Sequence, residues 1–540
     1  MQGLGSAIIA TSLVLCAVFV PVSFLAGITG QLYRQFTITI AVSVLISTLV
    51  ALTLSPAMCA LLLKPDSGKK KNKLFRYINL WLARGNRLYE KLIRKGLKHA
   101  RRVVAAFGIS LIAIWVLNEI VPQSFMPQED QGYFTVELEL PEGATLERTR
   151  HVTERAMNYL MSREDVEYIL NVTGSSPRVG TNQSRSQLTV ILKPWEDRKS
   201  SNLRDIMEEI REELKKYPES KVYLSTPPVI PGLGSSGGFE MVLEARSDAS
   251  YADLQRAADT LLYYASQRKE ISGLSSSIQN DIPQLYFDVD RDKAQMLGVK
   301  IADIFSTLKT FTGSIYVNDF NMFTSTTISG EAAPGYSSGQ AMAILEEIAS
   351  KHLPKNIGVE WSGLSYQEKH VSGQTAYILA LALLFVFLFL AAQYESWSIP
   401  IAVILSLPIA GVGAYLGNWI CGLENNIYFQ IGLVMLVGLV AKNAILIVEF
   451  AKDEVEKGNN AVDAVIKAAH LRFRPIVMTS LAFILGMLPL VFASGPGSAS
   501  RQGIGTGVFF GMIVAITVGI IFVPLLFVWV YKLKSKMMKR

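Results

Sequence analysis

The sequence predicts an α-helical polytopic membrane protein with about eight spans and an external α+β domain. Three observations predict this fold class. Half of the 540 residues are hydrophobic and the mean hydropathy is +0.30, which is too apolar for a wholly soluble chain. Apolar runs of about 20 residues, the length that crosses a bilayer, recur near both ends of the chain. Between them, residues 123–373 alternate in the manner of short strands and amphipathic helices.

The apolar runs define the spans. They cover, in order, roughly 7–27, 36–63, 103–121, 374–393, 397–420, 427–451, 475–494 and 503–531. The first run has the length of a signal peptide, but no basic segment precedes it and it leads directly into a second run. We therefore interpret it as a retained helix. Region 1–63 then holds two spans, 103–121 one, and 374–540 five spans and a tail.

Basic residues are concentrated beside the spans. The net charge is +7, yet residues 64–102 hold fourteen Lys and Arg against two acids, a local charge of +12. Such clusters mark the cytoplasmic side of a membrane protein, and the predicted 452–474 loop and the tail "KLKSKMMKR" carry the same signal. Eight spans then put both termini in the cytoplasm and 123–373 in the periplasm. A cluster confined to the membrane boundary argues against nucleic acid as a partner.

The basic segment 64–102 also has a helical pattern. Leu74, Ile78, Trp81, Leu88 and Leu92 recur at helical spacings with basic residues between them, which predicts an amphipathic helix. The pattern leaves two interpretations open. The helix lies on the inner face of the membrane, or it packs against the ends of the spans.

The external region begins with a recognisable module. "YFTVELEL" alternates like a strand, and Thr145 is the expected cap of a helix that runs to about Met161. Strands near 166–172 and 186–193, a helix near 202–215 and the strand "KVYLS" follow. The resulting βαββαβ order is the split ferredoxin-like pattern. Region 123–232 is therefore expected to be one such subdomain.

A second module, 233–373, follows the glycine-rich "VIPGLGSSGGFEM". Its expected strands lie near 238–244, 273–278 and 284–290, with a helix at 251–268 and a further strand–helix–strand unit before the fourth span. No nucleophile–base pair, phosphate loop or calcium loop appears in it, so we do not expect an enzyme. The three cysteines and five histidines lack metal-ligand spacing, and no cofactor or metal site is expected.

Lys442 is the unusual residue of the sixth run. It lies inside "GLVAKNAILIVEF" (438–450), next to Asn443. A lysine in hydrocarbon costs about 2.5–3.5 kcal/mol on insertion scales and marks a partner, a pathway or a proton relay. Glu449 lies on the same helical face but two turns away, about 10 Å, which is too far for a direct ion pair.

The chain contains an internal repeat. "TSLVLCAVFVPVSFLAG" (11–27) matches "TSLAFILGMLPLVFASG" (479–495), which aligns Thr11, Pro21, Phe24 and Gly27 with Thr479, Pro489, Phe492 and Gly495. Repeated halves are common among transporters, with the coupling site at their interface. The first copy has almost nothing before its TSL helix. We therefore expect a carboxy-terminal portion of a two-repeat protein, with the counter-charge of Lys442 on a helix outside it.

Several motifs carry a resemblance over nearly the whole chain. They are "LYRQFTITIAVSVLISTLVALTLSPAMCALLLKP", "GEAAPGYSSG", "YESWSIP", "YFQIGL", "AKNAILIVEFAKD" and "RPIVMTSLAFILGMLPLV". The chain resembles resistance–nodulation–division (RND) multidrug efflux pumps, most closely their hydrophobe/amphiphile branch in Gram-negative bacteria. The resemblance implies proton-driven efflux of amphiphilic drugs or other toxic compounds from the inner membrane, through periplasmic porter subdomains. It also implies a homotrimer that works with a periplasmic adaptor protein and an outer-membrane channel.

The resemblance also implies a proton relay. In the family a lysine faces two adjacent aspartates of another span, with a threonine and an arginine nearby. These roles fall on Lys442, Thr479 and Arg472, with Asn443 as a further candidate, and the aspartate pair has no counterpart. Each candidate has a simpler interpretation: Asn443 and Thr479 as helix-packing residues, and Arg472 as an ordinary cytoplasmic charge.

The chain departs from the family pattern in two places. "VNDFNMFTSTTISG" closes almost at once a gap that holds a docking segment in the family, so the docking insert is expected to be short. "NVTGSSPRVGTNQSRSQLTV" lacks the phenylalanines that line the drug pocket of well-known members. Two alternatives therefore stay open: a non-transporting membrane-anchored remnant or split-gene half that needs a partner chain, and RND export of lipids or metal ions.

Overall fold

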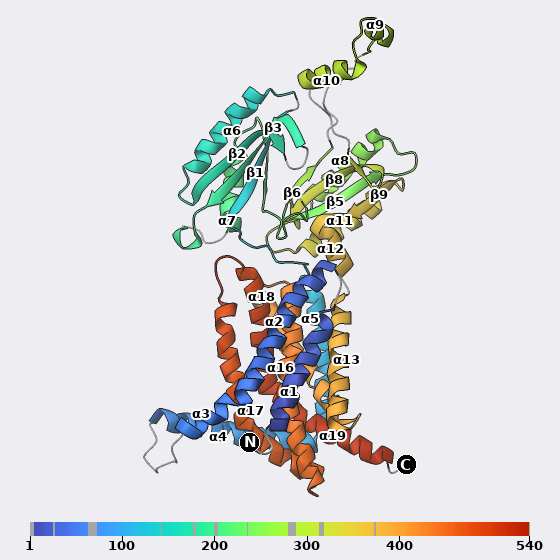
Figure 1. The fold of residues 1–540 in the computed structure, drawn as a ribbon. Helices are drawn as coiled ribbons and strands as arrows, with labels where there is room; N and C mark the ends of the chain where they lie inside the picture. Colours follow the sequence, from blue (N-terminus) through green and yellow to red (C-terminus); the bar gives the residue numbers. More distant parts are fainter. Residues whose placement is uncertain are drawn as a thin grey trace. The chain divides into compact units, whose positions relative to one another are not determined.

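The chain divides into two compact units in a computed structural model. The structure describes residues 5–538 except 25–26, 63–72, 142, 177–179, 199–202, 235, 279–287, 313–317 and 372–373. The first unit comprises Met1–Pro127, Val371–Ser494 and Ser498–Arg540, and the second comprises Gln128–His370 with Gly495–Gly497. The first is helical and the second is built from two β-sheets with helices on them (Figure 1).

The amino-terminal part of the first unit is a series of five helices. They are α1 (Gly5–Val22), α2 (Gly27–Leu52), α3 (Leu54–Leu62), α4 (Lys73–Lys98) and α5 (Ala100–Ile120). Helix α1 packs against α2. A single residue, His99, separates α4 from α5.

The remaining helices of this unit follow the second unit in the sequence. They are α12 (Gly363–Val371, which reaches the first unit only at its last residue), α13 (Gln374–Tyr394), α14 (Ile399–Ile404), α15 (Leu407–Ile420), α16 (Ile427–Glu456), α17 (Ala461–Val491), α18 (Ser498–Val514) and α19 (Ile520–Met538), with a π-helical turn at Ala515–Gly519. Within the described residues, seven helical stretches are long and apolar enough to cross a membrane, and α1 is a shorter apolar helix over Ile8–Val22.

The prediction of a loop over 452–474 is wrong. Helix α16 continues to Glu456 and α17 begins at Ala461. The charged residues that suggested a loop lie on the helix ends, where Glu454 accepts ion pairs from Lys457 at 3.1 Å and Lys467 at 2.7 Å. Hydropathy detects where a helix leaves hydrocarbon, but a helix held by such pairs continues beyond that point.

The second unit begins with a four-stranded antiparallel sheet. Its elements are β1 (Tyr133–Glu139), α6 (Leu146–Met161), β2 (Val166–Ser176), β3 (Gly180–Leu192), a 3₁₀ turn (Trp195–Asp197), α7 (Leu203–Leu214) and β4 (Lys221–Ser225). The strand order is β2-β3-β1-β4. Helices α6 and α7 cover one face, where Phe134, Leu188 and Ile206 are fully buried. The Thr145 hydroxyl accepts the Arg148 N–H at 3.3 Å, so its predicted role as helix cap is confirmed.

The second sheet repeats the order of the first. Its elements are β5 (Phe239–Ala245), α8 (Tyr251–Ser266), β6 (Ile271–Ser276), α9 (Arg291–Met296), α10 (Ile301–Thr312), β7 (Asn318–Phe320), β8 (Phe323–Ala332), α11 (Ser338–His352) and β9 (Ile357–Trp361). The order β6-β8-β5-β9 matches β2-β3-β1-β4 when β7, which pairs only with β8, is left out of the count. The predicted strand near 284–290 lies outside the described residues except 288–290, which form no strand.

A tight turn joins β7 to β8. Asn321 and Met322 are its two central residues, with φ of 51° and 67°, and both strands pair across it. Two consecutive left-handed residues are the geometry of a two-residue hairpin turn, which suits Asn and Gly far better than Met. The Met322 side chain is 97% exposed. The chain therefore reverses within two residues at the position where the sequence predicts a shortened insert.

Candidate functional site

Helix α16 is the most enclosed helix of the first unit. It packs against α1, α2, α13, α14, α15, α17, α18 and α19. Asn426 caps it by accepting the N–H groups of Tyr428 and Phe429, both at 3.1 Å. Gly438 allows α1 to come close, because a Cβ there would lie 2.5 Å from Leu15 Cδ2. Lys442 is one turn further along the same face, so its side chain leaves α16 on the side near α1.

Lys442 lies in this apolar setting with no acidic side chain paired to it among the described residues. Its side chain is partly buried. Among the residues that the structure describes, no carboxylate forms an ion pair with its ammonium. Within this described part of the chain, burial away from water is the one influence on its charged form. An ammonium in such a position is stable only if it reaches water, a polar group or a carboxylate.

Asn443 connects α16 to α17. Its side-chain amide donates to the Ser480 hydroxyl at 3.1 Å, and Ser480 is buried with 2% exposure. Hydrogen bonds between spanning helices add about 0.6 kcal/mol on average, with a maximum near 1.7 kcal/mol. This contact fixes which turn of α17 faces which turn of α16.

A second set of polar side chains lies about two helical turns further along the contact between α16 and α17. The Arg472 guanidinium stacks on the Phe450 ring, 4.4 Å from its centroid. Glu449, the neighbour of Phe450, interacts electrostatically with Arg472. One buried polar atom on each of Glu449, Arg472 and Tyr394 has no hydrogen-bond partner in the described part of the chain. Three helices thus bring a carboxyl, a guanidinium and a phenol into one polar cluster.

Thr479 lies beside Ser480 but has a different environment. It is exposed, and its hydroxyl donates to the carbonyls of Pro475 and Ile476 in its own helix, at 3.0 and 3.1 Å. Among the described residues, Asn443 is the one predicted site residue with a side-chain hydrogen bond to the neighbouring helix, whereas Arg472 reaches that helix by stacking on Phe450. Lys442 and Arg472 lie about two turns, or 10 Å, apart along the register.

Sequence reasoning missed Ser480, although the internal repeat contained a signal for it. Ser480 aligns with Ser12 in the same register that aligns Thr479 with Thr11. Ser12 is also buried, and it accepts a hydrogen bond from Thr48 of α2 at 2.5 Å. In both copies, the serine of the TSL motif joins its helix to a neighbour. A repeated serine that bonds between helices is more informative than the threonine before it.

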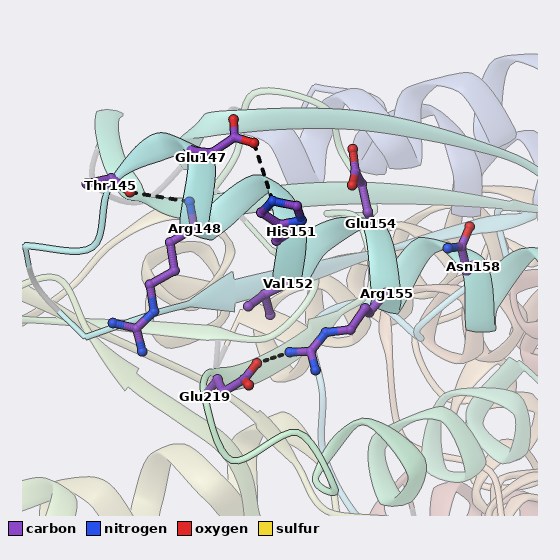
Figure 2. Close-up of a pocket in the computed structure, with 9 residues that line it drawn as sticks. All are labelled: Thr145, Glu147, Arg148, His151, Val152, Glu154, Arg155, Asn158 and Glu219. Atoms are coloured by element: carbon purple, nitrogen blue, oxygen red, sulfur yellow. Dashed lines mark hydrogen bonds and ion pairs between the residues drawn. The ribbon is translucent and has the colours of Figure 1, made fainter.

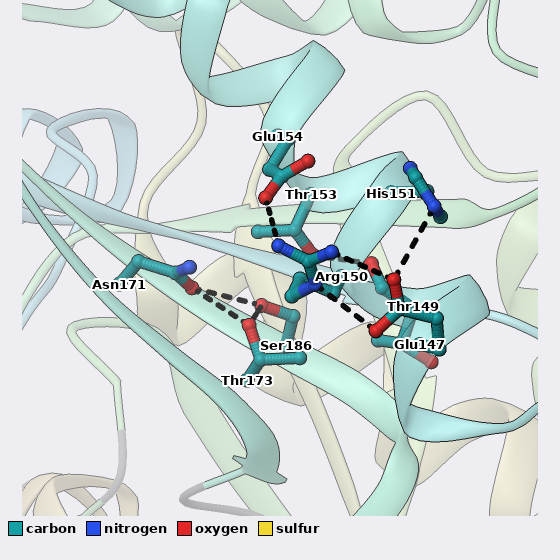
Figure 3. Close-up of polar contacts among 9 residues, drawn as sticks. All are labelled: Glu147, Thr149, Arg150, His151, Thr153, Glu154, Asn171, Thr173 and Ser186. Carbon is teal, nitrogen blue, oxygen red and sulfur yellow. Dashed lines mark hydrogen bonds and ion pairs between the residues drawn. The ribbon is translucent and has the colours of Figure 1, made fainter.

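The second unit has an open depression along α6, which offers a contrasting site. Figure 2 shows its lining residues, which are Thr145, Glu147, Arg148, His151, Val152, Glu154, Arg155, Asn158 and Glu219. Its charges largely neutralise one another. Arg150 bridges Glu147 at 2.6 Å and Glu154 at 2.7 Å (Figure 3), and Arg155 pairs with Glu219. Exposed pairs of this kind are ordinary helix-surface chemistry, and they leave little unmatched charge for a ligand.

Comparison with known proteins identifies the family of the chain. The model described as the AcrB/AcrD/AcrF family matches residues 1–326 and 320–531. The chain belongs to this family. It is 37% identical to the "Toluene efflux pump membrane transporter TtgB" of Pseudomonas putida over 99% of the chain and 57% of that protein. It is 37% identical to the "Multidrug export protein AcrF" of Escherichia coli over 98% of the chain and 57% of the relative.

The chain is a multi-pass inner-membrane protein, as its membership of the AcrB/AcrD/AcrF family and its apolar helices show. It spans a little over half the length of these curated relatives, and the same holds for the "Multidrug resistance protein MdtF" of Escherichia coli, at 36% identity and 58% of its length. The alignment with TtgB covers 597 positions, more than the 540 residues of the chain. That relative therefore carries segments within the matched region that this chain lacks.

Proposed function

We propose that the chain is part of an inner-membrane pump that exports amphiphilic drugs or other toxic compounds in exchange for protons. One observation carries the proposal: Lys442 lies at the centre of the helical unit with no carboxylate partner among the described residues. A charge kept in hydrocarbon is a functional residue by default. The family supports the direction, since its relatives are named as efflux pumps for drugs and solvents. The protein acts as a secondary transporter and not as an enzyme.

The relay works by switching an electrostatic attraction. A carboxylate outside the described residues faces Lys442 and attracts its ammonium. Proton uptake neutralises the carboxylate and releases the lysine, and α16 then shifts against its neighbours. The Asn443–Ser480 bond passes this movement to α17, on which Arg472 lies. Thr479 takes part through its exposed hydroxyl, which can turn away from its own helix. No cofactor or metal is required.

The substrate surface lies in the second unit, which we assign to the periplasm. Its two sheets are ferredoxin-like porter subdomains, and the shared strand order supports this assignment. On the face of the first sheet opposite α6 and α7, Tyr168, Leu170 and Val172 are 62%, 60% and 44% exposed, and Ile191 pairs with Tyr168 on the same face. An exposed apolar face of this kind suits an amphiphilic substrate. Tyr133 of β1 also pairs with Ile191 on this face, so tyrosine rings and aliphatic side chains together form the contact surface.

The proposed assembly follows the family. The chain has eight spans when α1 is counted, with both termini in the cytoplasm, and it forms a homotrimer with a periplasmic adaptor and an outer-membrane channel. The docking insert is shortened at the β7–β8 turn. Two observations support the shortening: the family match breaks into two segments that meet at residues 320–326, and the alignment with TtgB is longer than the chain.

The experiment compares two lysines of the same helix region. The gene is expressed with its flanking coding sequence in a Gram-negative host that lacks its own pumps, and resistance to a panel of amphiphilic drugs is measured. Lys442→Ala should lower resistance about tenfold, the effect of losing about 1.4 kcal/mol of coupling. Lys457→Ala is the matched control, because this exposed lysine pairs with Glu454 just past the end of α16.

The outcomes separate the candidate functions. Equal resistance with Lys442→Ala and wild type, at equal protein amount, removes Lys442 from the mechanism. If deletion of the native gene changes no drug susceptibility and its expression confers none, the chain is the non-transporting alternative. Resistance that appears only with a second expressed reading frame identifies a split protein, of which this chain is one part.

A further inference from the structure

Helix α4 is fixed beside the membrane at both of its ends. The apolar stretch Gly27–Leu62 precedes it by ten residues, and α5, which is apolar enough to cross a membrane, begins two residues after it ends. Because only His99 separates α4 from α5, the carboxy-terminal end of this 26-residue helix stays at the membrane boundary. Its sides must therefore face the other helices, the lipid or the aqueous phase next to the headgroups.

One side of α4 packs against α17 and α19. Tyr89 is buried, stacks on Phe473 at 5.1 Å and donates to the Ile520 carbonyl at 3.0 Å. The Asn86 amide lies 3.2 Å from His470 Nδ1, and Glu90 pairs with the same imidazole. The only acid of the helix is thus turned toward α17, where it contacts the His470 imidazole.

A second side is apolar but uncovered. Tyr77, Trp81, Leu88 and Leu92 are 70%, 55%, 58% and 38% exposed. At 3.6 residues per turn these four fall within about 60° of one another around the helix axis. We call them the apolar stripe. A continuous stripe with an exposed tryptophan and tyrosine is typical of a helix in the interfacial layer of a bilayer.

A third side is basic and borders the apolar stripe. Its residues, the basic stripe, are Arg84, Arg87, Lys91, Arg94, Lys95 and Lys98. All six are exposed, and none forms an ion pair with a residue that the structure describes. They lie on the side away from the packed face, together with the apolar stripe. The outward surface of α4 therefore combines apolar side chains with cations and contains no anion.

We propose that the outward surface of α4 binds anionic phospholipids. The apolar stripe enters the boundary between headgroups and acyl chains, and the basic stripe contacts the lipid phosphates and anionic headgroups. Charge complementarity selects this occupant, because unpaired Lys and Arg beside a bilayer attract anionic lipids over neutral ones. Its attachment to apolar helices at both ends places the helix where these lipids are. The inference does not depend on whether the chain transports drugs.

The bound lipids also support α17. The packed face of α4 touches α17 at Phe473 and His470, next to Arg472. Lipid contacts that hold α4 on the bilayer surface therefore restrain the end of α17 that carries Arg472. Bound anionic lipid then helps to hold this end of α17 in place, in addition to surrounding it.

Site-directed lipid crosslinking tests this proposal with the full chain. The protein is reconstituted in nanodiscs that contain photoactivatable phosphatidylglycerol or, separately, photoactivatable phosphatidylcholine, and crosslinks to α4 peptides are quantified by mass spectrometry. We expect phosphatidylglycerol to crosslink about fivefold more than phosphatidylcholine, and the preference to decline as salt is raised. Equal yields from the two lipids would overturn the proposal.

Variants locate the effect on the basic stripe. Arg87→Gln with Lys91→Gln should lower the phosphatidylglycerol yield on α4 about fivefold or more. Arg87→Lys with Lys91→Arg keeps both charges and should retain the yield, which shows that the helix still folds. The matched control is Lys532→Gln with Lys534→Gln, two exposed lysines that follow the apolar part of α19. An equal loss in the control pair would mean that general positive charge, and not α4, selects the lipid.

Discussion

Ser480 and Thr479 are adjacent in sequence but lie in opposite environments. Substitutions at the two positions therefore distinguish a role in helix packing from a role in the relay. Ser480 is buried and accepts the Asn443 amide, whereas Thr479 is exposed and bonds only to its own helix. Ser480→Ala leaves the amide without its partner and should destabilise the helical unit by about 0.6–1.7 kcal/mol. Thr479→Ala should leave stability unchanged. Apparent Tm in detergent measures both effects, and equal losses would contradict the assignment.

Glu331 joins the two modules of the second unit. Its carboxylate accepts the Thr226 N–H at 3.0 Å, and Arg211 and Arg204 act on it electrostatically. Burial raises the pKa of the Glu331 carboxyl above its ordinary value, in spite of these opposing partners. Because the folded state holds the proton more tightly than the unfolded state, this carboxyl makes the protein less stable as pH rises above 4.5.

Glu331→Gln should therefore stabilise the protein at pH 8 and have little effect near pH 4.5. We expect a gain on the order of 1 kcal/mol, or about 2–4 °C in Tm, since the amide still accepts from Thr226 without carrying a charge. Glu346→Gln is a control for which we expect the opposite change in stability. Burial favours a higher pKa there, but hydrogen bonds from Lys369 and Trp361 outweigh it and the pKa of Glu346 is lowered. That variant should lose stability at pH 8, and a gain in both would refute the argument.

At the level of single elements, the β7–β8 hairpin contains local strain that the sequence did not reveal. Met322 has a φ of 67°, a region that costs an ordinary side chain about 1–2 kcal/mol. Met322→Gly should relieve this cost and raise the free energy of unfolding of the second unit by about 1 kcal/mol. Met322→Ala keeps a Cβ at the same φ and removes an exposed side chain, so it should have almost no effect. Thermal unfolding of both variants gives the comparison.

Elements differ in how far the sequence predicts them. The apolar helices follow from length and composition, because the hydrocarbon layer sets both. The Thr145 cap follows from local chemistry and is confirmed. The prediction of a loop over 452–474 is wrong because ion pairs at Glu454 extend the helices beyond the apolar run. Arg472 and Tyr394, which lie near Glu449, belong to other helices, and the register between helices depends on contacts such as Asn443–Ser480 that no local pattern contains.

Across the whole molecule, the predicted relay residues and their polar neighbours occupy two levels of the pair formed by α16 and α17. Lys442 and Asn443 form one level, and Glu449 and Arg472 form the other, about two turns away. Sequence analysis predicted that Glu449 is too far from Lys442 to pair with it, and the two described side chains form no ion pair. The sequence identified Lys442 by its cost in hydrocarbon, but not which partners each level has, since these are fixed by tertiary packing.

The apolar face of the first sheet leads to a prediction for the complete pump. Leu170 is 60% exposed on the face opposite the buried core, so a charge there costs little in folding. If amphiphiles bind this face, Leu170→Glu should lower resistance to them about tenfold by removing apolar contact and adding an unpaired charge. Tyr263→Glu on α8, 64% exposed, is the matched control and should retain resistance. Loss of resistance in both variants, or in neither, would contradict the assignment of the substrate surface to this face.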